Sequence, residues 1–285
     1  MTPPNSDNPA AKSNAPAKMK VVAGGGSPLG EILVAAKAWP VWMYLSLNDI
    51  RAKYRRASLG PLWLVIGMGI AMTGMAAAWS IIFKIDWRTY IPYMVAGMLS
   101  WQLISNYIVA SCDMFTHEFN SLVRSLPSPP IIYVFRFVMR GFWMYLHYLP
   151  FWILVMLVTG TFPTWNTLVY FPIGLFLVMI TALSVTALLG MASARFRDLS
   201  PAVSALMMPA MLMTPVMWKT EMLGEYGVFA TINPLTHYLE ILRAPLMGEA
   251  PDSVSLMLAM VLTSVFTLAA LWAYRKYRYY LVFWL

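Results

Sequence analysis

The stretch LWLVIGMGIAMTGMAAAWSIIF, residues 62–83, decides the fold class of this chain. It holds 22 consecutive residues without one charged side chain. A helix needs about 20 apolar residues to cross the roughly 30 Å hydrocarbon core of a bilayer. This stretch therefore predicts a transmembrane helix.

Three more runs have the same character: residues 90–112, 167–194 and 253–274 are also uncharged. Two runs are weaker. Residues 131–158 contain Arg136, Arg140 and His147, and residues 201–218 contain two prolines, Pro209 and Pro215, which should kink the helix. The chain is 60% hydrophobic and 11% charged, whereas soluble domains carry about 25% charged residues. We therefore predict an all-α, polytopic membrane protein with six spans, over about 62–83, 90–112, 131–158, 167–194, 201–218 and 253–274.

The positions of the cations predict the orientation, because lysine and arginine are retained on the cytoplasmic side. With the N-terminus inside, 16 of the 20 lysines and arginines fall on the inner side. Only Lys84, Arg88, Lys219 and Arg243 fall outside. Both termini are therefore expected in the cytoplasm, and the net charge of +8 is interpreted as a topology signal rather than a nucleic-acid surface.

The residues before the first span divide into two parts. Residues 1–28 are rich in Pro, Ala, Asn, Ser and Gly and predict a disordered cytoplasmic tail. Residues 29–58 predict an amphipathic helix in the inner interface, ahead of a six-helix transmembrane domain over 59–285. Its apolar side recurs at helical spacing from Trp39 to Tyr54, with Arg51, Arg55 and Arg56 outside that arc. These residues can anchor the helix to lipid phosphates and fix topology, or they can also contact the pyrophosphate of a ligand. For Arg136 and Arg140 two interpretations stand, snorkelling to water or contact with such a pyrophosphate.

Six motifs in order resemble one family. They are DIRAKYRRASLGPLW (49–63), IPYMVAGMLSWQ (91–102), ARFRDLSPAV (194–203), TPVMW (214–218), INPLTHYLEILRAPLMG (232–248) and RKYRYYLVFWL (275–285). Together they resemble the membrane subunit of bacterial cell-surface polysaccharide exporters, which are ATP-binding-cassette transporters of the type 2 class that move O-antigen, capsule or teichoic-acid chains. The resemblance covers nearly the whole chain after residue 40 and implies location in the inner membrane.

Energy for such transport has to come from a partner. No GxxxxGK[ST] sequence is present, and that motif is what cradles nucleotide phosphates in a P-loop. The resemblance implies two ATPase subunits that hold ATP and magnesium, a second copy of this chain, and a lipid-linked polysaccharide as substrate; no cofactor is expected in this chain. It also implies that the inner loop over 113–130 docks on the ATPase. There a short helix with Thr116 as cap is expected, and the docking role falls on His117, Glu118, Phe119, Leu122 and Arg124.

The outer segment over 219–252 is too long for a turn. Asn233 and Pro234 form an N-cap and first-turn pair for a helix to Arg243, which Pro245 then ends. Two short re-entrant helices would suit a lid, and the resemblance implies a periplasmic gate. The gate residues are Asn233, Pro234, His237, Tyr238, Glu240 and Arg243. Their spacing fits neither an HExxH metal site nor a fixed carboxylate pair.

Aromatic and small residues complete the predictions. Aromatic side chains that could line a conduit for sugars are Trp63, Trp79, Tyr93, Trp101 and Tyr107, although Trp and Tyr also collect at membrane interfaces. Ala182, Thr186, Gly190 and Ala194 repeat every four residues and predict close helix packing.

Two alternatives to polysaccharide export stay open on sequence alone. One is an integral-membrane glycosyl- or phosphotransferase acting on a polyprenyl-linked substrate. The other is an exporter of a drug or small lipid built on the same machinery.

Overall fold

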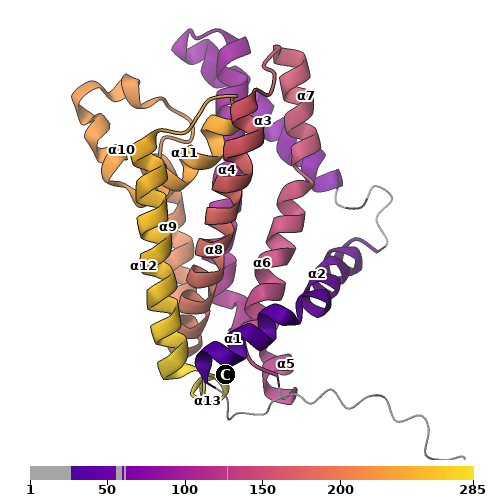
Figure 1. Cartoon of the computed structure of the whole chain (residues 1–285). Coiled ribbons are helices and arrows are strands. Elements are labelled where there is room, and N and C mark those ends of the chain that lie inside the picture. The colour runs from indigo at the N-terminus through magenta and orange to yellow at the C-terminus, as the bar shows by residue number, and fades with distance from the viewer. Residues whose placement is uncertain (1–26, 56–59, 61, 127) are drawn as a thin grey trace, which may run out of the picture.

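Figure 1 shows a computed structural model, which describes residues 27–55, 60, 62–126 and 128–285. Every regular element in these described ranges is helical. In chain order they are α1 (Pro28–Lys37), α2 (Trp39–Lys53), α3 (Leu62–Phe83), α4 (Trp87–Asp113), η2 (Met114–Glu118), α5 (Asn120–Ser125), α6 (Ile131–Leu146), α7 (Leu149–Thr159), α8 (Trp165–Arg195), α9 (Leu199–Met213), η3 (Thr220–Gly227), α10 (Val228–Ile232), α11 (Pro234–Leu246), α12 (Ser253–Tyr277) and α13 (Leu281–Trp284). The predicted all-helical class is confirmed. The tail over 1–26 and Arg56 lie outside the described residues.

The long helices form a bundle whose two ends differ (Figure 1). At the lower end in the figure, α1 and α2 cross beneath the bundle, near α5 and α13; we call this the α2 end. At the opposite end lie α10 and α11, and we call this the α11 end. Helix α8 packs against α4, α11 and α12, and so joins the two halves of the chain.

Four helical segments in the described part of the chain are long and apolar enough to cross a membrane: Leu62–Phe83, Ile131–Thr159, Trp165–Arg195 and Ser253–Tyr277. They coincide with four of the six predicted spans. The segment Ile131–Thr159 comprises α6 and α7, which are separated at His147 and Tyr148. Pro150 follows this break in the first turn of α7, where a missing N–H removes no hydrogen bond.

The predicted second span is a helix of a different kind. Helix α4 has 27 residues, enough for about 40 Å at 1.5 Å per residue. It carries polar residues such as Gln102 and Asn106, so its hydropathy is lower than that of the four segments above. More than half of its residues are buried, against α3, α8, α9 and α11 among others. A helix surrounded by protein does not need a lipid-facing apolar surface.

The packing of α4 on α8 follows the predicted small-residue face. Thr186 is fully buried and its hydroxyl lies 2.8 Å from the Ser111 hydroxyl of α4. A Cβ added to Gly190 would lie 2.9 Å from the Phe115 ring. The repeat of small residues therefore allows close approach, as predicted.

The helix before the first span is two helices rather than the single one predicted. Helix α1 ends at Lys37, and α2 starts at Trp39 with Pro40 in its first turn. Buried Glu31 of α1 accepts a hydrogen bond from the Tyr274 hydroxyl of α12 at 2.9 Å and lies 3.4 Å from Arg278 Nη1. A buried ion pair therefore ties the start of the described chain to the end of α12.

The predicted fifth span is helical only over Leu199–Met213, which is about 22 Å at 1.5 Å per residue. Pro209 lies inside this helix, and Pro215 lies beyond its end. An irregular segment over 214–219 follows, and η3, α10 and α11 return the chain to the bundle. The predicted capping is confirmed, because Asn233 Oδ1 accepts from Leu235 N at 3.0 Å and Pro234 occupies the first turn of α11. The predicted stop at Pro245 is wrong by one residue, since α11 continues to Leu246 and ends directly after the proline, which removes one helical hydrogen bond.

Candidate functional site

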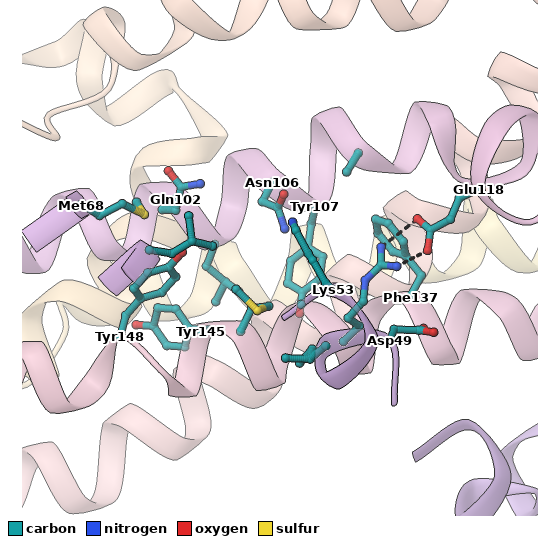
Figure 2. A pocket seen from close by; sticks show the side chains of 17 residues that line it. Asp49, Lys53, Met68, Gln102, Asn106, Tyr107, Glu118, Phe137, Tyr145 and Tyr148 are labelled. Carbon is teal, nitrogen blue, oxygen red and sulfur yellow. Dashed lines mark hydrogen bonds and ion pairs between the residues drawn. The ribbon is translucent and has the colours of Figure 1, made fainter. Parts of the chain in front are cut away.

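A cavity of about 510 Å³ lies between α2, α3, α4 and α6, bounded at one end by η2 (Figure 2). Its volume falls in the range of about 300–1,000 Å³ usual for small-molecule sites. Its lining residues are Asp49, Ile50, Lys53, Leu64, Met68, Gln102, Leu103, Asn106, Tyr107, Ala110, Glu118, Phe137, Arg140, Gly141, Met144, Tyr145 and Tyr148.

One end of the cavity is charged. Glu118 of η2 and Arg140 of α6 form a two-fold hydrogen-bonded ion pair, with Arg140 Nη2 at 2.8 Å from Glu118 Oε2 (Figure 2). Asp49 of α2 pairs with Arg136 of α6 through Nε at 2.8 Å and Nη2 at 2.5 Å. Such bidentate pairs fix both side chains and are the stronger kind of hydrogen bond. They hold α2 and η2 against α6.

Lys53 is the cation at this end that has no acidic partner among the described residues. Its Nζ lies 5.9 Å from the centre of the Tyr54 ring. Both carboxylates that line the cavity are already paired with arginines. The unmatched positive charge favours an anionic ligand group at this end of the cavity.

The other end of the cavity is aromatic. Tyr145 and Tyr148 lie close to Met68 and Gln102, on the far side of Tyr107 from the charged end (Figure 2). Tyr107 is 2% exposed and donates its hydroxyl to Val138 O at 2.8 Å. Gly141 makes room for this ring, because a Cβ there would lie 2.5 Å from Tyr107 Cε1. Aromatic faces with neighbouring amides can stack and hydrogen-bond a polar ligand.

The predicted interfacial anchors lie on or near α2. Arg51 and Arg55 are exposed, whereas Tyr54 is partly buried at the end of α2. Burial raises the pKa of the Tyr54 phenol above its ordinary value. None of these three described anchors lines the cavity, whereas Lys53 of α2, one turn from Asp49, does.

The predicted docking loop contains two helical elements, where one short helix was expected. A π-helical turn, η2, continues α4 directly, and α5 follows. Thr116 does not cap a helix: it lies within η2, its hydroxyl donates to Cys112 O of α4 at 3.4 Å, and Phe119 holds the N-cap position of α5. The continuity of α4 into η2 makes this loop an extension of the bundle.

The five docking residues divide between surface and interior. The side chains of His117 and Arg124 are exposed, and His117 Nε2 lies 4.0 Å from Asp113. Leu122 is partly buried. Phe119 is 2% exposed and stacks on Tyr133 with ring centres 5.3 Å apart, so its ring packs within this chain rather than on a surface. Glu118 belongs to the cavity described above.

The five predicted conduit aromatics are not brought together. Tyr107 lines the cavity, and Trp101 is buried elsewhere on α4 at 6% exposure. Trp63 is exposed on α3, while Trp79 stacks on Phe83 with centres 5.0 Å apart. Tyr93 lies toward the α11 end.

Tyr93 belongs to a second constellation, which we call the tyrosine–arginine clamp: Tyr90, Tyr93 and Arg243 around the segment 215–218. The Tyr90 hydroxyl donates to Met217 O, and the Tyr93 hydroxyl donates to Trp218 O at 3.0 Å. Arg243 Nη1 lies 2.6 Å from Pro215 O and 2.7 Å from the Tyr93 hydroxyl. These bonds satisfy carbonyls that lie outside any helix, and buried backbone groups need such partners.

The remaining predicted gate residues surround the clamp. Glu240 accepts from Arg243 Nη2 at 2.5 Å. His237 is buried, with Nδ1 3.1 Å from Ser255 Oγ and Nε2 2.9 Å from Thr231 O. The Tyr238 hydroxyl belongs to a buried cluster of three hydroxyls, together with those of Thr181 and Thr263. Asn233 donates to Thr214 Oγ1 at 2.9 Å, and so ties the start of α11 to the end of α9.

Several cavity residues were not singled out by the sequence analysis. Gln102 and Asn106 are polar residues four positions apart in an otherwise apolar run, and hence on one side of α4. That spacing could have predicted a polar face on this helix. Nothing comparable marked Lys53, Tyr145 or Tyr148, whose cavity positions depend on how α2 and α6 meet α4.

The fold and these two constellations define an integral membrane protein with a polar cavity at one end and a buried polar clamp at the other. Residues 41–247 match the family model of the ABC-2 type transporter, which covers more than half of the chain, and the chain belongs to that family. It is therefore the membrane subunit of a transporter whose ATPase is a separate subunit, and the transferase alternative is set aside.

Among known proteins the chain is similar to two O-antigen export system permease proteins RfbA of Klebsiella pneumoniae. One is 22% identical over 240 residues, which are 81% of this chain and 90% of the relative. The other is 24% identical over 196 residues, which are 66% of this chain and 73% of the relative. The family resemblance seen in the sequence motifs is thereby confirmed.

Proposed function

We propose that this chain is the permease of an exporter that moves a lipid-linked cell-surface polysaccharide, of O-antigen type, across the bacterial inner membrane. The observation that carries the proposal is the gradient inside the 510 Å³ cavity, from the unmatched charge of Lys53 to the aromatic and amide groups around Tyr145. A lipid-linked glycan carries chemical groups in the matching order: a phosphate, which suits the charged end of the cavity, is followed by polar sugars, which suit the aromatic end. The names of the two relatives support the same substrate class.

The proposed orientation sets the α2 end in the cytoplasm, with both termini inside. The excess of cations on that side supports it. The proposed six spans are the four long apolar segments, the buried helix α4, and a fifth crossing in which α9 covers about 22 Å at 1.5 Å per residue and the segment 214–219 covers the rest. The clamp supports this fifth crossing by supplying hydrogen bonds to its irregular part.

In the same proposal two ATPase subunits dock on η2 and α5 of two copies of this chain. His117 and Arg124 are the exposed members of the predicted docking set and offer the contact surface. Glu118 then transmits movement of the ATPase to the cavity, because it is hydrogen-bonded to Arg140, which lines that cavity. The nucleotide-driven movement of the partner would thus reach the substrate site through one ion pair.

The test is ATP-dependent transport of lipid-linked polysaccharide in proteoliposomes that contain the chain and its ATPase. Lys53→Gln should reduce transport at low substrate concentration by about tenfold to a hundredfold, since a charge-assisted contact contributes about 1.5–3 kcal/mol. Lys53→Arg keeps the charge and should retain most of the activity. Export of a small drug or lipid, with no transport of polysaccharide by the unaltered chain, would refute the proposal in favour of the alternative substrate class.

A further inference from the structure

Helix α12 carries an exposed apolar stripe along one face. The stripe consists of five residues at helical spacing, each 51–68% exposed: Met257, Val261, Val265, Leu268 and Trp272. From Met257 to Lys276, one turn beyond the stripe, the helix extends about 28 Å at 1.5 Å per residue, close to the roughly 30 Å of a hydrocarbon core. Since α12 is one of the four segments able to cross a membrane, this face suits contact with lipid chains.

The stripe ends in two exposed cations at the α2 end of the bundle (Figure 1). The Nζ of Lys276 lies 5.0 Å from the centre of the Trp272 ring and 5.2 Å from that of the Tyr277 ring. Arg275 is its exposed neighbour, and within the described ranges neither cation forms an ion pair. Arg278, by contrast, is buried and paired with a carboxylate of α1. Two positive charges are therefore uncompensated where the stripe ends.

Aromatic rings surround this end of the stripe and continue into α13. The Tyr277 ring lies 6.1 Å from that of Trp272 and 5.8 Å from that of Trp284, measured between ring centres. Tyr280 stacks on Trp284 with centres 6.1 Å apart, and Phe283 is 85% exposed. Tryptophan and tyrosine favour the layer in which lipid headgroups meet lipid chains. The two cations thus lie at the depth of the headgroups.

We propose that the end of α12 binds an anionic phospholipid of the bilayer, with the lipid phosphate at Arg275 and Lys276 and an acyl chain along the stripe. The surface matches both parts of such a molecule, because uncompensated cations attract the headgroup and the exposed stripe covers the chain. From Lys276 back to Val265 is about 16 Å at 1.5 Å per residue, which is about one leaflet of the hydrocarbon core.

The charge of the headgroup is what the surface selects. A zwitterionic phospholipid brings a cation of its own to the same place, so its net attraction to two cations is weaker. A soluble phosphate offers no chain for the stripe. The inference needs only the membrane class of the chain, and it is independent of the substrate that the proposed function assigns.

The experiment is native mass spectrometry of the full chain with its ATPase, released from micelles after titration with phosphatidylglycerol or with phosphatidylcholine of the same acyl chains. The test variant combines Arg275→Gln and Lys276→Gln. The matched control combines Lys84→Gln and Arg88→Gln, which remove two exposed cations near the α11 end. The control is close in kind, because Arg88 lies over the Trp87 ring at 5.4 Å from its centre.

The unaltered chain should bind its first phosphatidylglycerol at lower concentration than its first phosphatidylcholine. The test variant should raise the phosphatidylglycerol concentration at half occupancy by about 25-fold, since each cation near an anionic headgroup contributes about fivefold. Its binding of phosphatidylcholine should not change, and the control should keep the preference of the unaltered chain. Equal losses in the two double variants would overturn the inference, because they would show a general attraction of anionic lipid to surface charge.

Three further outcomes would also overturn it. One is an unchanged preference for phosphatidylglycerol in the test variant. Another is the absence of any preference in the unaltered chain, as expected where a second copy covers the stripe. The third is competition by soluble glycerol phosphate at the same concentrations, because the stripe would then contribute nothing.

Trp272 supplies an independent readout of the lipid chain. Phosphatidylglycerol that is brominated on its acyl chains should quench the tryptophan fluorescence of the unaltered chain more than that of Trp272→Phe. This difference should be larger than with brominated phosphatidylcholine at the same concentration. Equal differences for the two lipids would contradict the placement of the anionic lipid beside Trp272.

Discussion

The sharpest structural prediction concerns Gly97, where α4 passes the segment after α9. A Cβ added to Gly97 would lie 2.6 Å from Val216 O and 3.7 Å from Arg243 Cδ. The first contact is with backbone, so it cannot be relieved by rotating a side chain. The backbone of the segment 214–219 would have to move, and the bonds of the clamp would lengthen with it.

Overpacking of this kind costs about 1–3 kcal/mol. The matched control is Gly74→Ala in α3, where an added Cβ meets nothing within 4 Å. Both changes share the same gain in helix propensity, up to about 1 kcal/mol, so the difference between the two variants reports the clash alone. In soluble chains of 150–250 residues 1 kcal/mol corresponds to roughly 2–4 °C in Tm.

We therefore expect Gly97→Ala to melt several degrees below Gly74→Ala. The assay is thermal unfolding of the two purified variants in one detergent, followed by fluorescence-detected size exclusion. Equal melting temperatures, or a more stable Gly97→Ala, would refute the close approach of α4 to Val216 on which the clamp depends.

Other predictions test separate parts of the molecule. Glu31→Gln should lower the free energy of unfolding by about 3 kcal/mol, because it removes the negative charge of the buried ion pair with Arg278. The double change to methionine at both positions should restore part of the loss in the same melting assay. His117→Ala should weaken co-purification of the ATPase without changing Tm. Phe119→Ala should instead lower the free energy of unfolding by about 3–5 kcal/mol, since its ring is 2% exposed. The reverse pattern would contradict the placement of His117 on the surface and Phe119 in the interior. Asn233→Ala should cost about 1 kcal/mol through loss of the α11 cap, measured as a small fall in Tm, and no fall would argue against that cap.

For most of the candidate site, the sequence predicted the segments involved but not the contacts between their residues. The motif DIRAKYRR predicted a basic interfacial segment, and its first five residues form the end of helix α2, but the sequence could not indicate that Asp49 would pair with Arg136. The two residues are 87 positions apart, and their meeting depends on how α2 crosses α6. For the same reason the sequence left Arg136 and Arg140 either to snorkel to water or to contact a pyrophosphate, whereas in the structure each has a carboxylate partner within the chain.

The sequence by itself determined the membrane class, the four long apolar segments, the small-residue face of α8 and the capped start of α11. These features depend on the length of an apolar run, on helical spacing or on neighbouring residues, and such local quantities are present in the chain before it folds. Only the tertiary structure decided that α4 is enclosed by protein despite its polar residues, that Phe119 packs inward, and that Tyr90, Tyr93 and Arg243 converge on the segment after α9. Each of these depends on which helices become neighbours, because a buried polar group is stable only where another part of the chain supplies its partner.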